Sequence, residues 1–472
     1  MESRKTFRDW QPHEYARRPI TPTDVLPEDD LVFFLLDLVP KMNLSAIYEY
    51  YDRETRGAPP FDVAMMSTLL LYAYCVGVFS SRKIAAACER NLAFLAIVGN
   101  QRPDFRTISE FRRIHLDALA DLFVEVLRVA GEAGMIKLGN LAVDGSKFRA
   151  NASRHKAMSY GYMRKEVARL RQEMTDLLQQ AEQIDAEQDA ALGARRGDEL
   201  PEELKRREDR LALIEEAMRR LEQEARERAE AERQEREQAQ AERAAQGKPP
   251  RGKPAKPISD EPADRAQTNF TDPEAKIMKT ANKGFDYCFN GQTVVDEEHQ
   301  IILAAENVPA ANDKQQAVPL AEATLANLEA AGIELPREES RPDADAAKIP
   351  LSGDNGYFSE EAVGGLEGLG FDPYLATGRQ KHHTAEALAV EGAPPAEATV
   401  KERMSHKLRT AEGRKRYAKR KSIVEPVFGQ IKHVRGFRQF LLRGLHKVRA
   451  EWKLVCLTHN LLKIWRYRYA LI

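Results

Sequence analysis

The chain has 472 residues, of which 43% are hydrophobic and 31% charged, and its formal net charge at pH 7 is −1. This length allows about two to four domains, and a charged share above the ~25% of typical globular domains indicates some solvated helix or linker. The four cysteines form no CxxC pair, which argues against a zinc ribbon or a disulfide framework and fits a reducing cytoplasm. No apolar segment follows Met1-Glu-Ser-Arg-Lys, so we expect no signal peptide.

The near-zero net charge hides a strong asymmetry along the sequence. Residues 401–472 contain 20 Lys and Arg but only four acids, so they carry +16 and residues 1–400 carry −17. Basic blocks of this kind usually bind the phosphates of nucleic acid. Glu425 lies inside the block, and a carboxylate there indicates a metal site aimed at a phosphodiester.

Residues 1–125 have the pattern of short helices. Asp62 is expected to cap one helix, Ser80 or Ser81 the next, and Thr107 to Glu110 fit a capping box for a third, which continues through Leu122. Basic residues on these helices predict a DNA-reading surface, and a helical bundle with a solvated basic face is the alternative: Arg82, Lys83, Arg90, Arg106, Arg112 and Arg113.

One uncharged segment, Val63 to Ser81, is long enough to span a bilayer. It contains several polar side chains and Gly77, so we expect a buried helix of a compact domain and no membrane segment.

Residues 158–266 have a different character. Apolar residues recur at alternating spacings of three and four, as in coiled coils, along two stretches: Val167, Leu170, Met174, Leu177, Ala181 and Ile184, then Leu211, Ile214, Met218, Leu221 and Ala225. The pattern predicts two long helices folded back as an antiparallel hairpin, with breaks at Gly193, Gly197 and Pro201 between them. The second helix is expected to run into solvent beyond Ala225. Residues 246–266 are rich in Pro and Lys and predict a flexible linker.

Short apolar strands alternate with helices on either side of this insertion, which predicts an α/β core. Strands are expected at Leu141–Val143, at Ile349–Ser352 and in a meander from Tyr287 to Ala304. The meander should turn at Asn290-Gly291 and again at 296–299. Helices are expected from Pro319 to Ala331 and from Ser359 to Leu366.

Three acidic residues follow or flank these elements. Asp144 and Asp354 each come directly after a short apolar strand, and Glu425 begins an apolar helical stripe. Three converging carboxylates can hold two Mg²⁺ ions, which prefer oxygen ligands and act together on phosphodiesters. Turn chemistry explains each aspartate equally well on its own. Other aspartates can replace Asp354 as the second ligand: Asp286, Asp296 and Asp313.

The helix around Glu425 has two further signals. Ser422-x-x-Glu425 is a capping-box pattern, which would give Glu425 a structural role. Pro426 is tolerated only near a first turn, so we expect this helix to begin close to Ser422.

Several motifs resemble the insertion-sequence transposases of the DDE superfamily, in the branch with a Tyr-x2-Arg-x3-Glu-x6-Lys signature. This chain reads Tyr417-x2-Arg420-x4-Glu425-x6-Lys432, so its Arg-to-Glu spacing is one residue longer. Four further blocks carry the resemblance: Gln101 to Arg112, Val143-Asp-Gly-Ser-Lys147 with Ala150 to Ser153, Thr377-Gly-Arg-Gln-Lys381, and Val424 to Gly429 with Arg435-Gly-Phe-Arg438.

The resemblance covers most of the chain outside roughly 160–266 and implies an RNase H-like core, a mixed sheet flanked by helices. With the N-terminal all-α domain and the coiled-coil hairpin predicted above, the expected domains are a DNA-binding domain (1–125), the first part of the catalytic domain (139–158), the insertion (159–245), the linker (246–266) and the remainder of the catalytic domain (267–472).

The resemblance also implies roles for single residues. Asp144, Asp354 and Glu425 are the expected catalytic residues and ligands of two Mg²⁺ ions, with Mn²⁺ as an alternative metal. Lys432 is expected to contact phosphate near the cleaved end. The expected DNA-binding residues also include Tyr417, Arg420, Arg435 and Arg438, whereas the aromatic residues between the C-terminal cations are expected in the core: Phe437, Phe440 and Trp452.

The leading hypothesis is therefore a transposase that cuts and rejoins double-stranded DNA at the terminal inverted repeats of its element. It is expected to act as a homodimer in the bacterial cytoplasm, nucleoid-associated when bound to DNA, with the hairpin serving dimerisation or DNA positioning. The alternatives are a catalytically inactive, transposase-derived DNA-binding protein and a coiled-coil scaffold.

Overall fold

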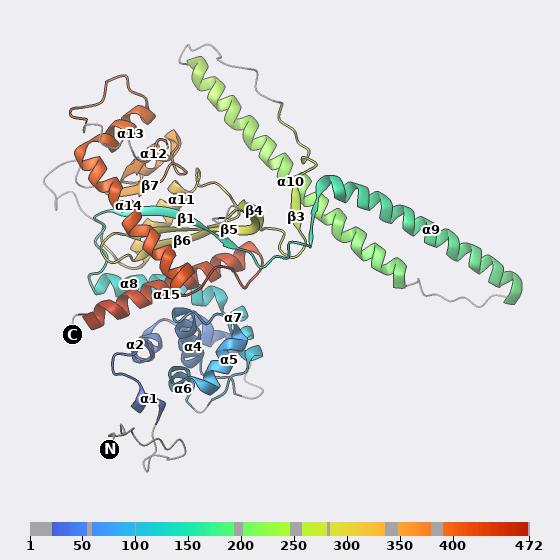
Figure 1. The fold of residues 1–472 in the computed structure, drawn as a ribbon, viewed down its shortest axis with the longest axis horizontal. Coiled ribbons are helices and arrows are strands. Elements are labelled where there is room, and N and C mark those ends of the chain that lie inside the picture. Colours follow the sequence, from blue (N-terminus) through green and yellow to red (C-terminus); the bar gives the residue numbers. More distant parts are fainter. Residues whose placement is uncertain are drawn as a thin grey trace, which may run out of the picture. The chain divides into compact units, whose positions relative to one another are not determined.

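The computed structural model describes residues 21–53, 59–99, 101–192, 202–245, 257–280, 284–335, 348–378 and 390–470 (Figure 1). The chain divides into two compact units. The first comprises residues 1–148, 290–442 and 446–472, and the second comprises residues 149–289 and 443–445. The N-terminal helices and most of the sheet thus share one unit, and β1 and β5 each begin in one unit and end in the other.

Short helices form the N-terminal part of the first unit: α1 (Pro22–Val25), α2 (Leu31–Leu38), α3 (Ser45–Asp52), α4 (Val63–Cys75), α5 (Ser81–Arg90), α6 (Leu92–Val98), α7 (Phe105–Ile114) and α8 (Leu116–Glu132). A 3₁₀ turn, Val39–Lys41, follows α2. The Asp62 side chain caps α4 by accepting a hydrogen bond of 2.8 Å from Met65 N–H, as predicted. The backbone of Ser80 caps α5, although its side chain makes no capping hydrogen bond.

The capping box predicted at Thr107 is wrong. Asp104 caps α7 through its carboxylate, which accepts hydrogen bonds from the N–H groups of Arg106 and Thr107. Glu110 is therefore not needed at the helix start and pairs with Arg113 at 2.5 Å. The predicted long helix is also divided at His115, where α7 ends and α8 begins.

Helix α4 is almost entirely buried, which agrees with the prediction of a buried apolar helix for this segment. Within the described ranges, no single helix is long and apolar enough to cross a membrane. The pair Leu31–Lys41 and Ser45–Asp52, bent by 66°, meets the length and composition limits only when taken together.

A mixed sheet forms the centre of the first unit. Its strands are β1 (Leu141–Arg149), β5 (Phe285–Asp296), β6 (Ile302–Val308), β7 (Ile349–Gly353) and β8 (Phe371–Leu375). They lie in the order β5-β1-β7-β8, with β6 paired to β5. The β1–β7 and β7–β8 pairs are parallel, and the β5–β6 pair is antiparallel.

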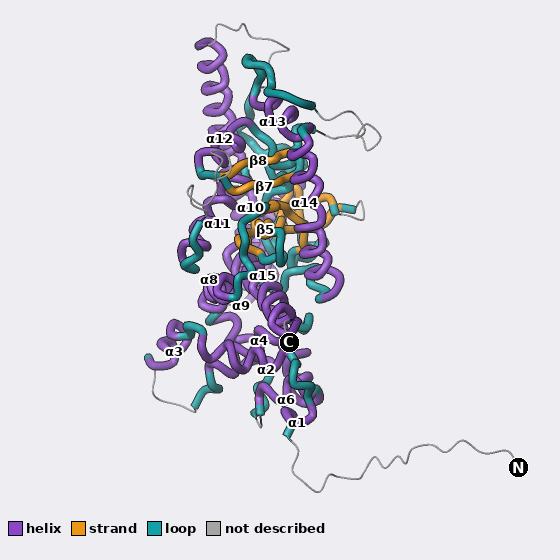
Figure 2. The backbone as a smooth tube through the Cα atoms, turned by 90° about the vertical axis from the view of Figure 1, so that its left-hand side faces the viewer, coloured by secondary structure: helices purple, strands orange, loops and turns teal. Residues whose placement is uncertain are grey.

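Helices cover both faces of this sheet (Figure 2). Helices α11 (Ala317–Ala330) and α12 (Glu360–Gly368) lie on one face, and α14 (Ala411–Gly429) lies on the other. Ser359 caps α12 by accepting a hydrogen bond of 3.0 Å from Ala362 N–H, as predicted. The remaining helices are α13 (Val400–Arg409) and α15 (Leu445–Ala470), and a π-helical turn, Gln430–Val434, follows α14.

Two predicted boundaries in this sheet and its helices are wrong. Strand β5 continues through Asn290-Gly291, where a turn was expected. Gly291 packs against the Trp452 ring, and a Cβ at this position would lie only 3.0 Å from the ring atoms. Helix α14 begins at Ala411 and contains Pro426, so it does not begin near Ser422. The hydroxyl of Ser422 bonds to the carbonyl of Lys419, so Ser422 and Glu425 form no capping box.

In the second unit, α9 (Tyr160–Leu192) and α10 (Glu202–Ala245) run antiparallel, as ion pairs and hydrogen bonds along their length show. Three residues of the predicted apolar stripes are buried between these helices, Leu170, Ile214 and Leu221, together with three that were not predicted: Tyr160, Met163 and Ala217. Beyond Ala229 most of the described side chains of α10 are exposed. The expected breaks at Gly193, Gly197 and Pro201, and residues 246–256 of the linker, lie outside the described residues.

Three short strands complete the second unit. Strands β2 (Ala157–Ser159) and β3 (Gln267–Asn269) form an antiparallel pair. Strand β4 (Lys276–Lys279) pairs with the first residues of β5, from Phe285 to Cys288.

Candidate active site

Asp144 lies within β1, and Asp354 directly follows β7, the strand that pairs with β1 in parallel. Leu141 pairs with Leu351 and Ala142 with Ser352, just before the two aspartates. The negative charge of Asp354 acts on the Asp144 carboxylate and raises its pKa. The structure thus brings together the two aspartates that the sequence predicts as the first two members of the site.

Asp144 is a half-buried carboxylate whose pKa is raised. Burial raises its pKa to about 6, and the negative charges of Asp354 and Asp313 add to the rise. Arg420 opposes it, because Nη1 of its guanidinium lies 3.3 Å from Asp144 Oδ2, and Gly145 N–H donates a hydrogen bond of 2.8 Å to Oδ1. The site therefore gathers more negative charge than Arg420 alone neutralises.

Arg420 comes from α14 and is 9% exposed. Its Nε–H has no hydrogen-bond partner among the described residues, which is costly for a buried donor. The Tyr417 ring centroid lies 6.0 Å from the Arg420 guanidinium. The first two residues of the four-residue signature, Tyr417 and Arg420, therefore lie together near Asp144. In this structure Arg420 thus bonds to the acidic site and keeps one donor for a further acceptor.

A third aspartate, Asp313, belongs to the same group. Its Oδ1 accepts hydrogen bonds from Asn290 Nδ2 at 2.7 Å and from Gln292 Nε2 at 2.6 Å. The Tyr357 hydroxyl donates to Gln292 Oε1 from the other side. Sequence patterns indicate Asp313 only as an alternative ligand and do not indicate Asn290, Gln292 or Tyr357. The available signal for the two amides was their position as polar residues in the predicted meander, whereas nothing in the sequence marks Tyr357.

The glycines of this site are required by close packing. A Cβ on Gly145 would stand 2.8 Å from Cδ and even closer to Nε2 of Gln292. A Cβ on Gly356 would stand 2.9 Å from Asp354 Oδ1 and 3.2 Å from Asp313 Oδ2. Asp354 Oδ1 accepts a hydrogen bond of 2.7 Å from Gly356 N–H, and Asp313 approaches the same glycine, so a side chain at position 356 would collide with both carboxylates.

Glu425, the third predicted acid, is placed differently. It is exposed on α14 and makes no hydrogen bond or ion pair with any described residue. Among the residues that the structure describes, no group of three or more acidic, histidine or cysteine side chains is arranged to hold a metal ion. The structure thus brings Asp144 and Asp354 together but does not show Glu425 joining them.

Lys432 lies against the strand that carries Asp144. Its Nζ donates hydrogen bonds to Ser146 Oγ at 2.5 Å and to the Lys147 carbonyl at 2.8 Å, and it lies 4.3 Å from the centroid of the Phe148 ring. Helix α14 and the π-helical turn therefore follow β1, with Arg420 beside Asp144 and Lys432 two to four residues further along that strand.

The two arginines that follow Lys432 have different surroundings. Arg438 is exposed, and its Nε donates to the Lys432 carbonyl at 2.9 Å. Arg435 is 6% exposed and donates hydrogen bonds to Thr458 Oγ1 and to the Val455 carbonyl. Its guanidinium therefore stabilises α15 within the protein interior. Because Arg435 faces the protein interior, we leave it out of the proposed DNA-binding surface.

The other two alternatives for the second ligand have structural partners. Asp286, in the second unit, forms an ion pair with Arg154 at 2.6 Å. Asp296 accepts hydrogen bonds from the backbone N–H groups of Lys137, Leu138 and Glu298. These partners satisfy both carboxylates, so neither aspartate needs a metal ion to explain its position.

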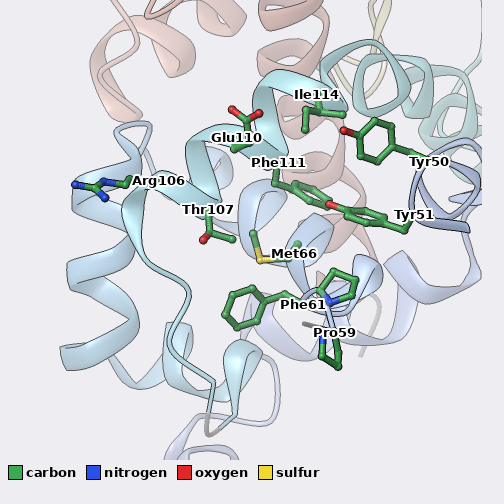
Figure 3. Close-up of a pocket in the computed structure, with 11 residues that line it drawn as sticks. Tyr50, Tyr51, Pro59, Phe61, Met66, Arg106, Thr107, Glu110, Phe111 and Ile114 are labelled. Carbon is green, nitrogen blue, oxygen red and sulfur yellow. The ribbon is translucent and has the colours of Figure 1, made fainter. Parts of the chain in front are cut away.

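The aromatic residues expected in the core are buried there: Phe437, Phe440 and Trp452. In the helical region, Arg112 is also buried and donates to the Phe79 carbonyl at 2.9 Å, so it cannot serve a DNA-reading face. Arg82 and Arg106 are exposed and flank the Phe105 ring. This region contains a cavity of about 700 Å³ lined mainly by aromatic and apolar side chains, and none of the acidic residues described above as site candidates lines it (Figure 3).

Two stretches of the chain match known protein families. Residues 21–113 match a family described as a transposase domain (DUF772), and residues 380–465 match one described as a transposase DDE domain. No curated protein and no solved structure matches the chain significantly. The first stretch contains α1 to α7, and the second contains Arg420, Glu425 and Lys432. Together the two matches support the assignment of the chain to the DDE-type insertion-sequence transposases.

Proposed function

We propose that this chain is a metal-dependent transposase that cuts DNA at the terminal inverted repeats of its element and joins the ends to target DNA. The observation that carries the proposal is the proximity of Asp144, on β1, to Asp354, directly after the neighbouring parallel strand β7, with the buried Arg420 paired to Asp144. Two buried or half-buried carboxylates in this position supply the hard oxygen ligands that Mg²⁺ or Mn²⁺ prefers. We further propose an RNase H-like core, and that α9 and α10 form a coiled-coil hairpin.

The chain's own residues divide the work of the reaction. Asp144, Asp354 and Glu425 would hold up to two divalent ions, with Glu425 completing the set when α14 meets DNA. The ions held there would supply the activation of a water or a 3′-hydroxyl and the stabilisation of the leaving oxygen at phosphorus. Arg420 would balance part of the negative charge of this site, since its Nη1 lies 3.3 Å from Asp144 Oδ2.

Lys432 and the cations around it would position the DNA backbone. Lys432 lies beside Ser146 and Lys147, close along the chain to Asp144, so a phosphate that contacts it would lie near the acidic pair. Tyr417, on α14, and Arg438, just after the π-helical turn, would extend this DNA-binding surface. A homodimer that joins two element ends, in the cytoplasm and on the nucleoid, remains part of this proposal.

A second candidate function, a transposase-derived protein that binds DNA without cutting it, is favoured by one observation. Glu425 is exposed and separate from the aspartates, so the described residues form no complete three-acid site. The longer spacing between Arg420 and Glu425 points the same way.

A cleavage assay separates the two functions. Full-length protein is incubated with Mg²⁺ and a duplex from the DNA flanking the coding region, and the products are examined for 3′-OH ends. We expect Asp144→Asn and Asp354→Asn to abolish cleavage while leaving DNA binding within a few-fold. Asp286→Asn is the matched control, because this acid pairs with Arg154 in the second unit, and it should retain cleavage. Salt-sensitive binding with no cleavage under Mg²⁺ or Mn²⁺ would establish the second function.

A further inference from the structure

A second cavity among the N-terminal helices lies at the start of α5. Its volume is about 490 Å³, and the residues that line it include Ser80, Ser81, Arg82, Phe105 and Arg106. Among the described residues around it only Glu110 is acidic, and this carboxylate is already paired with Arg113 at 2.5 Å. The cavity therefore has polar and basic walls, which suit an anion.

The first turn of α5 contributes backbone donors to this cavity. An α-helix leaves its first N–H groups without partners inside the helix, and they carry a partial positive charge. The Ser80 side chain makes no capping hydrogen bond to them, and the first turn of α5 contains no acidic residue. Phosphate groups bind readily to helix ends of this kind.

Ser81 gives a second and independent indication of a ligand. It is 8% exposed, and its Oγ has no hydrogen-bond partner among the described residues. A buried hydroxyl without a partner is costly, because it has lost its hydrogen bonds to water. Its side chain lines the cavity, so a ligand oxygen bound there can accept the missing hydrogen bond.

Two exposed arginines add charge at the same place. The guanidiniums of Arg82 and Arg106 lie 5.0 Å and 5.7 Å from the centroid of the Phe105 ring, so α5 and α7 each bring one cation to it. Arg82 forms no ion pair with any residue in the described ranges, and Asp104 acts on Arg106 only through charge. Both guanidiniums thus keep donors for a ligand that has several acceptor oxygens.

We propose that the start of α5, with the Ser81 hydroxyl and the guanidiniums of Arg82 and Arg106, binds one phosphate of the DNA backbone. The inference rests on the proposed function, which supplies DNA as the partner, and deepens it by assigning a contact outside the acidic site. A phosphate contact fixes the position of a duplex but carries no base sequence. Arg82 and Arg106, predicted for a DNA-reading surface, would therefore hold the DNA backbone and read no bases.

A comparison of two arginines on one helix tests the site. Arg82→Gln and Arg90→Gln remove the same charge, but Arg90 lies in the last turn of α5 and does not line the cavity. Affinities of the full-length proteins are measured by fluorescence anisotropy at several salt concentrations, for the duplex from the DNA flanking the coding region and for a shuffled duplex.

Arg82→Gln should weaken binding to both duplexes by the same factor, about 3- to 10-fold, and lower the slope of log affinity against log salt by about one. Arg90→Gln should change the affinity less than about twofold. A loss confined to the flanking duplex would mean that Arg82 reads bases, and equal losses for the two variants would mean a diffuse basic surface. Either result would overturn the inference.

Uncharged phosphates locate the contact on the DNA. In a series of duplexes, one phosphate at a time is replaced by a methylphosphonate. One position should weaken wild-type binding, and the same replacement should cost clearly less in Ser81→Ala and in Arg82→Gln, because the contact is already impaired. If every replacement costs the same in wild type and in both variants, these residues do not bind a phosphate.

A capping variant covers the case in which a loss of binding reflects poor folding. Ser80→Asp places a carboxylate where the phosphate would bind, so the melting temperature should stay equal or rise while the DNA affinity falls by about 10-fold. Asn91→Asp adds the same charge at the N-cap of α6, outside the cavity, and should leave the affinity within about twofold. A Ser80→Asp protein that binds DNA as wild type does would contradict the site.

A free phosphate compound is the other source of this chemistry. Thermal unfolding in millimolar sodium phosphate is compared with unfolding in sodium chloride of equal ionic strength. Stabilisation by phosphate that Arg82→Gln abolishes, with no effect of any methylphosphonate, would overturn the assignment to DNA. If wild type cuts DNA and every variant binds it normally, this inference alone fails, whereas a wild type that neither binds nor cuts DNA would also remove the proposed function.

Discussion

Gln300 Nε2 donates a hydrogen bond of 2.9 Å to the carbonyl of Ser422, the carbonyl that Pro426 leaves without its helical donor. In an α-helix the N–H of residue 426 would bond to the carbonyl of residue 422, and proline has no N–H. A side chain from the β5–β6 connection thus replaces the missing donor. This replacement explains how α14 continues through Pro426 and carries Glu425 within the helix.

The first prediction concerns this replacement. Gln300→Ala leaves the Ser422 carbonyl unpaired and should reduce the free energy of unfolding by about 1 kcal/mol. Pro426→Ala restores a backbone N–H that can bond to the Ser422 carbonyl, so in this background the same Gln300→Ala change should cost clearly less. Urea unfolding of the four proteins of this double-mutant cycle measures the difference. Equal costs in both backgrounds would mean that Gln300 does not act for Pro426.

The second prediction concerns Glu451 on α15, a buried acid with three hydrogen-bond donors. Burial raises its pKa to about 7. Hydrogen bonds from the N–H groups of Leu442 and Leu441 and from the Tyr74 hydroxyl, and the charge of Arg112, lower the pKa but do not offset burial. Since the folded pKa lies above the ordinary value of 4.5, the protonated form favours folding. Its contribution is full below about pH 4.5 and is lost as the pH rises toward about 7.

Glu451→Gln removes this titration. Between pH 4.5 and 7, wild type should lose up to about 3 kcal/mol of stability relative to the Gln variant. Chemical denaturation at several pH values measures this difference. Parallel stability profiles for the two proteins would show that Glu451 does not titrate in this range.

The third prediction concerns Gly145. A methyl group there would press on Gln292, which Asp313 and Tyr357 hold in place, so Gly145→Ala should destabilise the fold by about 1–3 kcal/mol and weaken Mn²⁺ binding. Gly364→Ala is the control, because a Cβ there meets nothing within 4 Å on α12, and it should stabilise by about 0.5–1 kcal/mol. Thermal unfolding of both variants decides. A Gly145→Ala protein as stable as wild type would show that Gln292 is free to move.

The fourth prediction uses two neighbouring residues of α10. Ile214 is 1% exposed against α9, whereas Leu213 is 50% exposed. Ile214→Ala should destabilise the second unit by about 2–5 kcal/mol, and Leu213→Ala should cost about 0.5 kcal/mol or less. Limited proteolysis between residues 160 and 245 reports on this unit. The Mn²⁺ affinity should be unchanged in both variants, and a joint loss would mean that the helix pair supports the acidic site.

The parts of the fold that sequence predicted well depend on local signals. Asp62 and Ser359 cap helices through their own side chains, and the strand that ends at Gly353 is a short apolar run before a turn sequence. Asp144 and Asp354 were identified for the same reason, because each follows such a run. The parallel pairing of β1 with β7 adds what the sequence could not give, because it brings the two aspartates close enough for the charge of Asp354 to raise the pKa of Asp144.

Three of the failures share a different cause, since in each a distant residue overrides a local preference. Asn290-Gly291 has turn chemistry, yet Gly291 lies within β5 because Trp452 needs its space. Pro426 predicts a helix start, yet Gln300 supplies the missing donor. Arg435 lies in a basic block but faces Thr458, and its burial is not visible from charge alone.

Gly77, just after α4, limits how the sequence of this chain can change in evolution. Its φ of +80° suits glycine, and a Cβ there would run into the carbonyl group of Arg435. Backbone therefore meets backbone between a residue of the first family match and a residue of the second. In a chimaera that takes residues 21–113 from one relative and residues 380–465 from another, neither backbone segment can move away from the other at this contact. The two stretches should therefore be taken from the same relative.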